Sequence, residues 1–169
     1  CEHEWVGPDR IGLAGHSYGG VVTALAMTRS DRFAAGISGA PVTDWRLYDT
    51  IYTERYMGTL QDNPGGYRDT SVVERARELS GRLLLAWGDL DDNVHPANPL
   101  RLLDRLVAAD RDVVTMVYPG RRHGISSRHW RRQQYEFILD ALRPEPPAPA
   151  GSTEPSTGTP DVEVATRGE

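Results

Sequence analysis

The chain has 169 residues, of which 38% are hydrophobic, and it carries a formal net charge of −5 and a single cysteine. That length suffices for one domain with a core of its own. The sequence contains no basic block typical of nucleic-acid binding and no apolar run near the ~20 residues of a membrane span. One cysteine also excludes an intrachain disulfide.

The first predicted elements flank a serine. The apolar run at residues 10–14 predicts a short strand, and residues 20–29 predict a helix. Between them stands Gly15-His16-Ser17-Tyr18-Gly19, the Gly-x-Ser-x-Gly pattern of a nucleophile elbow, a tight turn that exposes its serine. Because the turn is so tight, we expect both glycines to be required for steric reasons. The backbone N–H of Tyr18 would then help to bind an oxyanion.

Further strands and helices are predicted in alternation after the elbow. Residues 33–38, 82–87 and 113–118 read as strands, and 82–87 are apolar on both faces, which is typical of a strand buried in a parallel sheet. A turn is expected at residues 64–66, and Ser71 is placed to cap the helix that begins with it. The predicted helical segments that follow residue 38 are 45–57, 71–79, 98–109 and 128–142.

Strands that alternate with helices form a parallel sheet with helices on both faces. We therefore predict an α/β fold, specifically an α/β-hydrolase fold, reduced here to the nucleophile strand and three later parallel strands with flanking helices. This partial domain covers residues 1–142. From residue 143 the composition changes to Pro, Gly, Ser, Thr and acidic residues, which bury too little apolar surface to order a chain. Residues 143–169 are therefore predicted to be a disordered tail.

A catalytic serine needs a base and a group that orients the base. In α/β-hydrolases an Asp or Glu and then a His follow the serine, on loops after later strands. The loop after 82–87 offers Asp89, Asp91 and Asp92, and the pattern alone does not choose among them. His123 follows strand 113–118 and is the candidate base, whereas we expect His16 to pack rather than react. We expect neither a metal nor a cofactor: His95 with the nearby aspartates is the only candidate metal cluster, and a structural hydrogen bond is the favoured role of His95.

Two segments resemble the dipeptidyl peptidase IV branch of the prolyl oligopeptidase (S9) family of serine peptidases. They are residues 40–58, which include Tyr-Thr-Glu-Arg-Tyr-Met-Gly, and residues 88–95, which include Asp-Asp-Asn-Val-His. These strings are long and unusual, and the resemblance runs from about residue 5 to residue 142. It implies that Ser17 is the nucleophile, that Asp91 is the acid and that His123 is the base.

The resemblance also implies a substrate pocket. Asn93 would contact a substrate carbonyl, and the Tyr18 N–H would serve the oxyanion hole. An apolar box with aromatic walls independently suits a proline-sized side chain, although core packing is the commoner role of such aromatic residues. The residues implied to line the pocket for the residue before the scissile bond are Val42, Trp45, Tyr48, Tyr52 and Val94.

The sequence therefore predicts a serine peptidase that cleaves oligopeptides by acyl transfer after Pro or Ala at the second position. The alternatives are an acylaminoacyl-peptidase or an esterase with the same triad, or a truncated and inactive remnant. The family's catalytic domain has further strands and a preceding β-propeller, so we expect this chain to be the C-terminal part of a longer enzyme. The resemblance also allows a homodimer formed through the hydrolase domain and implies an oligopeptide substrate, while the lack of a basic block leaves no nucleic-acid partner expected.

Overall fold

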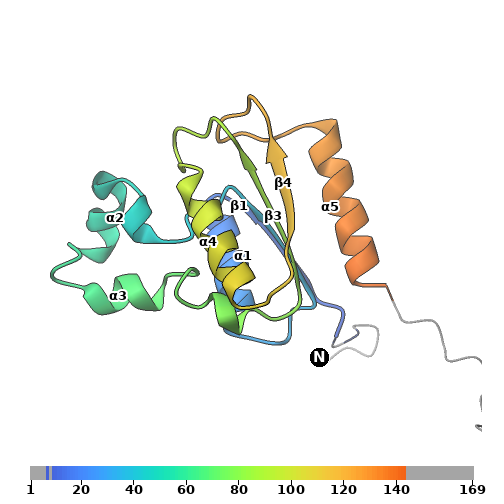
Figure 1. Cartoon of the computed structure of the whole chain (residues 1–169), viewed down its shortest axis with the longest axis horizontal. Helices are drawn as coiled ribbons and strands as arrows, with labels where there is room; N and C mark the ends of the chain where they lie inside the picture. Colours follow the sequence, from blue (N-terminus) through green and yellow to red (C-terminus); the bar gives the residue numbers. More distant parts are fainter. Residues whose placement is uncertain (1–6, 8, 144–169) are drawn as a thin grey trace, which may run out of the picture.

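Four parallel strands form one sheet in the order β1-β2-β3-β4 in the computed structural model, which describes residue 7 and residues 9–143. Sequence order and spatial order coincide, so each connection moves one strand along the sheet (Figure 1). The predicted strands and their parallel arrangement are confirmed. The strands are β1 (Gly12–His16), β2 (Ala35–Gly39), β3 (Arg82–Gly88) and β4 (Val114–Tyr118).

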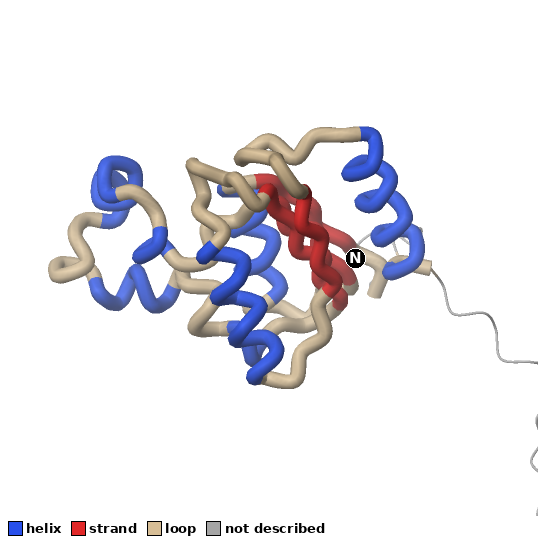
Figure 2. The backbone as a smooth tube through the Cα atoms, turned by 45° about the horizontal axis from the view of Figure 1, so that its top comes forward, coloured by secondary structure: helices blue, strands red, loops and turns tan. Residues whose placement is uncertain are grey.

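Helices cover both faces of the sheet (Figure 2). On one side, α1 (Tyr18–Met27) and α4 (Ala97–Ala108) pack against alternate residues of β3, namely Leu83, Leu85 and Trp87. On the other side, α5 (Arg128–Ala141) packs against Leu84 and Ala86. Strand β3 is therefore buried on both faces, as its continuous apolar sequence predicts. The two apolar layers hold the sheet rigid and leave the ends of its strands for loops.

The remaining elements depart in part from the prediction. The helical region expected at 45–57 is divided into η1 (Trp45–Leu47) and α2 (Thr50–Met57), because Asp49 is extended and its side chain accepts from the Tyr52 N–H at 2.8 Å to start a new helix. The expected turn at 64–66 opens the helix α3 (Pro64–Asp69), where Pro64 occupies a favoured first position.

The helix predicted at 71–79 is wrong. Only the single 3-10 turn η2 (Ala76–Glu78) forms there, because N–H groups of this segment donate to carbonyls three residues back rather than four, as Arg75 does to Val72 and Leu79 does to Ala76. The hydroxyl of Ser71 still accepts from the Glu74 N–H at 3.3 Å, so the capping contact forms without the helix. The N–H groups of Val72 and Val73 donate to the carbonyl of Thr43, which ties this segment to the loop after β2.

Helices α2 and α3 lie apart from the sheet, at the left of Figure 1. They are joined to it through the loop after β2 and through the segment that contains η2. No helix among residues 7 and 9–143 combines the length and apolar character needed to cross a bilayer. The tail predicted at 143–169 lies outside the described residues except for residue 143.

Candidate active site

The turn after β1 holds Ser17 in an unusual backbone conformation. Its φ of 58° and ψ of −119° lie where non-glycine residues are rare, so this turn stores strain. The Ser17 N–H donates to the Gly39 carbonyl at 2.7 Å, and the Ser17 carbonyl accepts from the Val21 N–H at 3.1 Å. These bonds hold the residue between β2 and the first turn of α1. The side chain makes no capping hydrogen bond to α1, so its hydroxyl is available to bond to another side chain.

Only one of the two glycines predicted to be sterically required, Gly15, lacks space for a side chain, and Gly20 lacks it as well. A Cβ on Gly15 would lie 2.1 Å from the Gly19 carbonyl oxygen, so the requirement for glycine at position 15 agrees with the prediction. A Cβ on Gly19 would meet nothing within 4 Å, so the expected steric reason at that position is wrong for the described chain. Gly20, which the sequence analysis passed over, needs the space instead, because its Cβ would lie 2.7 Å from the Gly39 carbonyl oxygen.

Three side chains from three separate loops form one hydrogen-bonded chain. Ser17 Oγ lies 2.9 Å from His123 Nε2, and His123 Nδ1 lies 2.8 Å from Asp91 Oδ2. The Asp91 side chain is only 1% exposed, whereas that of His123 is 24% exposed, so the histidine lies between a buried carboxylate and an accessible hydroxyl. The structure thus brings together all three residues expected to form the triad.

The loop after β3 selects Asp91 among its three aspartates. Asp91 Oδ1 accepts from the N–H groups of Asn93 at 3.0 Å and Val94 at 2.9 Å, which leaves Oδ2 for the histidine. Asp89 instead accepts from the Gly120 N–H at 2.6 Å, and Asp92 pairs with Arg122 at the surface. Neither of these two carboxylates reaches His123.

The loops that carry the acid and the base are packed directly against each other. A Cβ on Gly88 would lie 2.2 Å from the Arg121 carbonyl oxygen, so only glycine allows this approach. The Leu90 N–H donates to that same carbonyl at 3.0 Å. Gly88 was missed as a functional position, although a glycine at the carboxyl end of a buried strand is the signal that could have identified it. His16 lies beside His123, and their ring centroids are 5.0 Å apart.

Aromatic residues line a cavity of about 520 Å³, and one of them is Tyr18, the residue that follows Ser17. Trp45 stacks on Tyr52 with ring centroids 6.1 Å apart and an interplanar angle of 17°, and it meets the edge of Tyr48 at 6.0 Å. Val42 and Val94 are buried in the same apolar cluster as Trp45. Of the five residues predicted to line the pocket, Trp45 and Tyr52 line this cavity, whereas Val42, Tyr48 and Val94 pack around Trp45 without lining it.

Asn93, Tyr56, Met57 and Tyr18 also belong to this region. The Tyr48 hydroxyl lies 2.7 Å from Asn93 Oδ1, a bond that joins the aromatic segment to the acid loop. Tyr56 and Met57 also line the cavity and were missed by the sequence analysis. Tyr56 lies four residues after Tyr52 and therefore on the same face of α2, which is the signal that could have found it. The side chain of Tyr18 is 58% exposed and lies 6.1 Å from the Trp45 ring.

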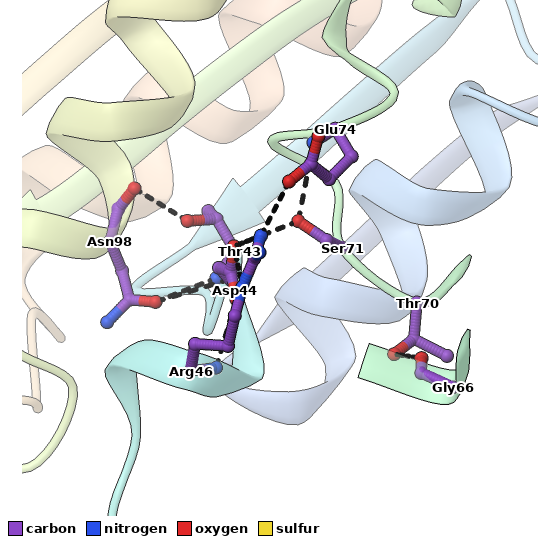
Figure 3. Close-up of polar contacts among 8 residues, drawn as sticks. All are labelled: Thr43, Asp44, Arg46, Gly66, Thr70, Ser71, Glu74 and Asn98. Atoms are coloured by element: carbon purple, nitrogen blue, oxygen red, sulfur yellow. Dashed lines mark hydrogen bonds and ion pairs between the residues drawn. The ribbon is translucent and has the colours of Figure 1, made fainter. Parts of the chain in front are cut away.

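A polar network surrounds the buried carboxylate of Asp44, which directly precedes Trp45 in the chain (Figure 3). Asp44 Oδ1 accepts from the Arg46 N–H at 2.9 Å and from Arg46 Nε at 2.8 Å, and its Oδ2 accepts from the Ser71 hydroxyl at 3.1 Å. Arg46 also donates to Glu74 at 2.7 Å. Burial alone would raise the pKa of Asp44, but the hydrogen bonds and charge of Arg46, together with Ser71, lower that pKa below its ordinary value.

The lowered pKa of Asp44 predicts an acid-dependent contribution to stability. Because the folded chain holds the ionised form, the contribution is complete above the ordinary pKa near 3.9 and is lost as the pH falls through the lower, folded value. We expect Asp44→Asn to lower the free energy of unfolding at pH 7 by about 1.5–3 kcal/mol, the usual contribution of hydrogen bonds to a charged group. Urea unfolding of both proteins between pH 3 and 7 would measure this difference.

The difference between the wild type and Asp44→Asn should shrink toward the acid end of that range. Asp69→Asn serves as a control, because Asp69 pairs with Arg68 at the surface and both side chains are more than half exposed. Its effect should be small at every pH. A difference for Asp44→Asn that stays constant from pH 3 to 7 would contradict the assignment.

A parallel α/β sheet whose strand ends carry a hydrogen-bonded Ser, His and Asp is the arrangement of a serine hydrolase. A sequence model of the prolyl oligopeptidase family matches residues 1–145. The chain therefore belongs to the prolyl oligopeptidase family, peptidase family S9. The resemblance noted in the sequence is confirmed.

Individual relatives agree with this assignment. Dipeptidyl peptidase 8 of Mus musculus is 41% identical over 149 residues, which cover 83% of this chain and 17% of the relative. A probable dipeptidyl-aminopeptidase B of Metarhizium robertsii is 44% identical over 82% of this chain and 16% of its own length. The crystal structure of Porphyromonas gingivalis dipeptidyl peptidase 4 superposes with a TM-score of 0.79 at 38% identity, covering 80% of this chain and 20% of that one. The chain thus spans about a fifth or less of these proteins.

Proposed function

We propose that this chain carries the catalytic triad of a dipeptidyl peptidase, with Ser17 as nucleophile, His123 as general base and Asp91 as the residue that orients the base. The observation that carries the proposal is the continuous hydrogen-bonded chain from Ser17 Oγ through His123 to Asp91 Oδ2. The names of the relatives, which are dipeptidyl peptidases and dipeptidyl-aminopeptidases, support the reaction class.

The chemistry follows from this geometry. His123 Nε2 takes the proton of Ser17 while Oγ bonds to the scissile carbonyl carbon, and the carbonyl oxygen becomes an oxyanion. The same histidine then gives that proton to the departing amine as the C–N bond breaks and the acyl-enzyme forms. Asp91 holds His123 Nδ1–H and stabilises the imidazolium. Water then hydrolyses the acyl-enzyme by the same route, which releases the acyl product and restores the serine.

The oxyanion is assigned to the N-terminus of α1. Because Ser17 precedes the first helical residue, the free N–H of Tyr18 and the positive end of the helix dipole lie beside the reacting carbon. A preorganised donor of this kind commonly contributes a factor of about 10²–10³ in kcat. This assignment uses the backbone of Tyr18 and leaves its exposed ring as part of the aromatic cavity.

The pocket suits a small, rigid apolar side chain before the scissile bond. Trp45 and Tyr52 supply flat walls, and the buried Val42 and Val94 close the cluster from behind. Proline and alanine fit such a box at little entropic cost, because neither has side-chain rotamers to lose. Asn93 accepts from Tyr48 through Oδ1, which directs its amide N–H groups to donate to a substrate carbonyl. We therefore propose cleavage after Pro or Ala at the second position of an oligopeptide.

The first test is covalent labelling of the 169-residue chain with a fluorophosphonate probe. We expect one label per chain, which peptide mass mapping should place on the peptide that contains Ser17. Ser17→Ala is the control and should take up no label, with circular dichroism showing that both proteins are folded. A folded wild-type chain that takes up no label would contradict the proposal.

A second test defines the substrate. Hydrolysis rates should be compared for a Gly-Pro anilide, an acetyl-Ala anilide and a p-nitrophenyl ester. We expect the Gly-Pro anilide to have the highest kcat/KM. Faster hydrolysis of the acetyl-Ala anilide would instead indicate an acylaminoacyl-peptidase, and a preference for the ester would indicate an esterase with the same triad.

A further inference from the structure

The buried side-chain carboxamide of Asn98 lies between the two segments that carry the proposed substrate pocket. Asn98 is 0% exposed and sits in the first turn of α4, directly after the loop that holds Asp91. A fully buried asparagine is uncommon, and it is retained only where its polar atoms find partners. Its carboxamide makes all of its bonds to backbone groups, and Figure 3 shows it facing the segment after β2.

One side of Asn98 holds the aromatic segment. Its Oδ1 accepts from the Thr43 N–H at 3.0 Å and is 3.5 Å from the Asp44 nitrogen, and its backbone carbonyl accepts from the Thr43 hydroxyl at 2.6 Å. Its Nδ2 donates to the Leu47 carbonyl at 3.4 Å. These contacts bracket the turn η1, on which Trp45 stands, from the residues before it to its last residue.

The other side of Asn98 holds the acid loop. Both its Nδ2, at 3.3 Å, and its backbone N–H, at 2.9 Å, donate to the carbonyl of His95. His95 directly follows Val94, which is buried against Trp45, and lies two residues after Asn93, which bonds to Tyr48. The same carboxamide therefore contacts the backbone of both segments, the one that carries Trp45 and the one that carries Val94.

We propose that Asn98 is a positioning residue that fixes the spacing between the Trp45–Tyr48 wall and the Asn93–Val94 wall of the substrate pocket. The proposal rests on the proposed function, because it assigns selectivity to that pocket. Asp44 provides a second attachment of the same segment. Its N–H faces Asn98, and its carboxylate accepts hydrogen bonds from Arg46 and Ser71. The segment that carries Trp45 is thus held by Asn98 on one side and by the Asp44 carboxylate contacts on the other.

The catalytic groups do not depend on these bonds. The carboxylate of Asp91 is oriented by the N–H groups of its own loop and by His123, and Ser17 is held by β2 and α1. None of these contacts passes through Asn98. Loss of the Asn98 carboxamide should therefore widen or tilt the pocket while the serine remains reactive, which separates this role from a general effect on folding.

The test compares two covalent probes on the 169-residue chain. An ethyl fluorophosphonate reacts with the serine and leaves the pocket empty, whereas a Gly-Pro diphenyl phosphonate must place its proline-like ring in the pocket. We divide the second-order rate constant for the Gly-Pro phosphonate by that for the ethyl fluorophosphonate. This ratio measures how well the pocket fits the proline-like ring, independently of the reactivity of the triad. We expect Asn98→Ala to lower this ratio by about tenfold or more, because small displacements of positioning groups are costly. The rate with the small probe should stay within about threefold of the wild type.

Two further variants make the result decisive. Thr43→Val removes only the hydroxyl that donates to the Asn98 carbonyl, keeps the side-chain shape, and should lower the ratio in the same direction by less. Leu106→Ala removes a fully buried apolar side chain from the same helix, in the cluster around β3. It should lower the melting temperature and leave the ratio unchanged.

The proposal is overturned if the ratio for Asn98→Ala and Thr43→Val equals that of the wild type. It is also overturned if both probes slow down in parallel, as they would for a purely structural defect. A folded wild-type chain that reacts with neither probe would refute the proposed function, and this proposal with it. Wild-type labelling with an unchanged ratio in the variants would refute the Asn98 proposal alone.

Discussion

Replacing Asp91 by asparagine is expected to lower the rate of Ser17 acylation by about 10⁴-fold, with little change in the fold. The carboxylate accepts the His123 Nδ1–H at 2.8 Å and so fixes the tautomer in which Nε2 can take the serine proton. An asparagine amide can donate to Nδ1 instead, which places the ring proton on Nε2, facing Ser17. Labelling kinetics with a fluorophosphonate, compared over several hours, would measure the loss.

The two neighbouring aspartates provide matched controls on the same loop. Asp89→Asn keeps an oxygen that can accept from the Gly120 N–H, and Asp92→Asn removes only a surface ion pair with Arg122. We expect each of them to change the labelling rate by less than about threefold, since exposed ion pairs usually contribute under 1 kcal/mol. An equal loss in all three variants would show that the loop as a whole, and not the Asp91 carboxylate, determines the rate.

The choice of Asp91 shows what the sequence pattern could and could not determine. Its place after an apolar strand located the acid loop, because the ligand sites of parallel sheets lie at the carboxyl ends of the strands. Asp89, Asp91 and Asp92 are equivalent by that criterion. What separates them is the direction of each side chain, which the loop amides of Asn93 and Val94 fix only after folding. The resemblance to a family resolved the choice, and the geometry agrees with it.

The segment at 71–79 forms tight turns in place of the predicted helix. The buried residues Val72, Ala76 and Leu79 have the spacing of a helical face, so the pattern itself is real. The N–H groups of the segment nevertheless bond three residues back rather than four, and those of Val72 and Val73 bond to the carbonyl of Thr43 on a distant segment, a contact that the apolar spacing does not encode. Asn98 escaped notice for a similar reason: a lone asparagine in a helical segment predicts an exposed position, and only its partners on other segments make it buried.

Replacing Gly15 by alanine is expected to destabilise the folded chain by about 3 kcal/mol or more and to abolish labelling of Ser17. The new methyl group would lie 2.1 Å from the Gly19 carbonyl oxygen and 2.2 Å from its carbonyl carbon. Both are backbone atoms of the turn, so no side-chain rotation relieves the contact, and a forced change of a strained backbone is among the few causes of such large effects. Thermal and urea unfolding would measure the loss.

Gly19→Ala is the matched control, because it adds the same methyl group at the other glycine of the motif. A Cβ there would meet nothing within 4 Å, and residue 19 lies in the first turn of α1, where alanine is the better helix former. We expect its stability to stay within about 1 kcal/mol of the wild type, and Ser17 to remain reactive. A loss for Gly19→Ala as large as that for Gly15→Ala would mean that the elbow tolerates no added bulk on either side. Unequal losses would instead locate the steric limit on the strand side of the serine, where β1 must stop abruptly for Ser17 to adopt its positive φ.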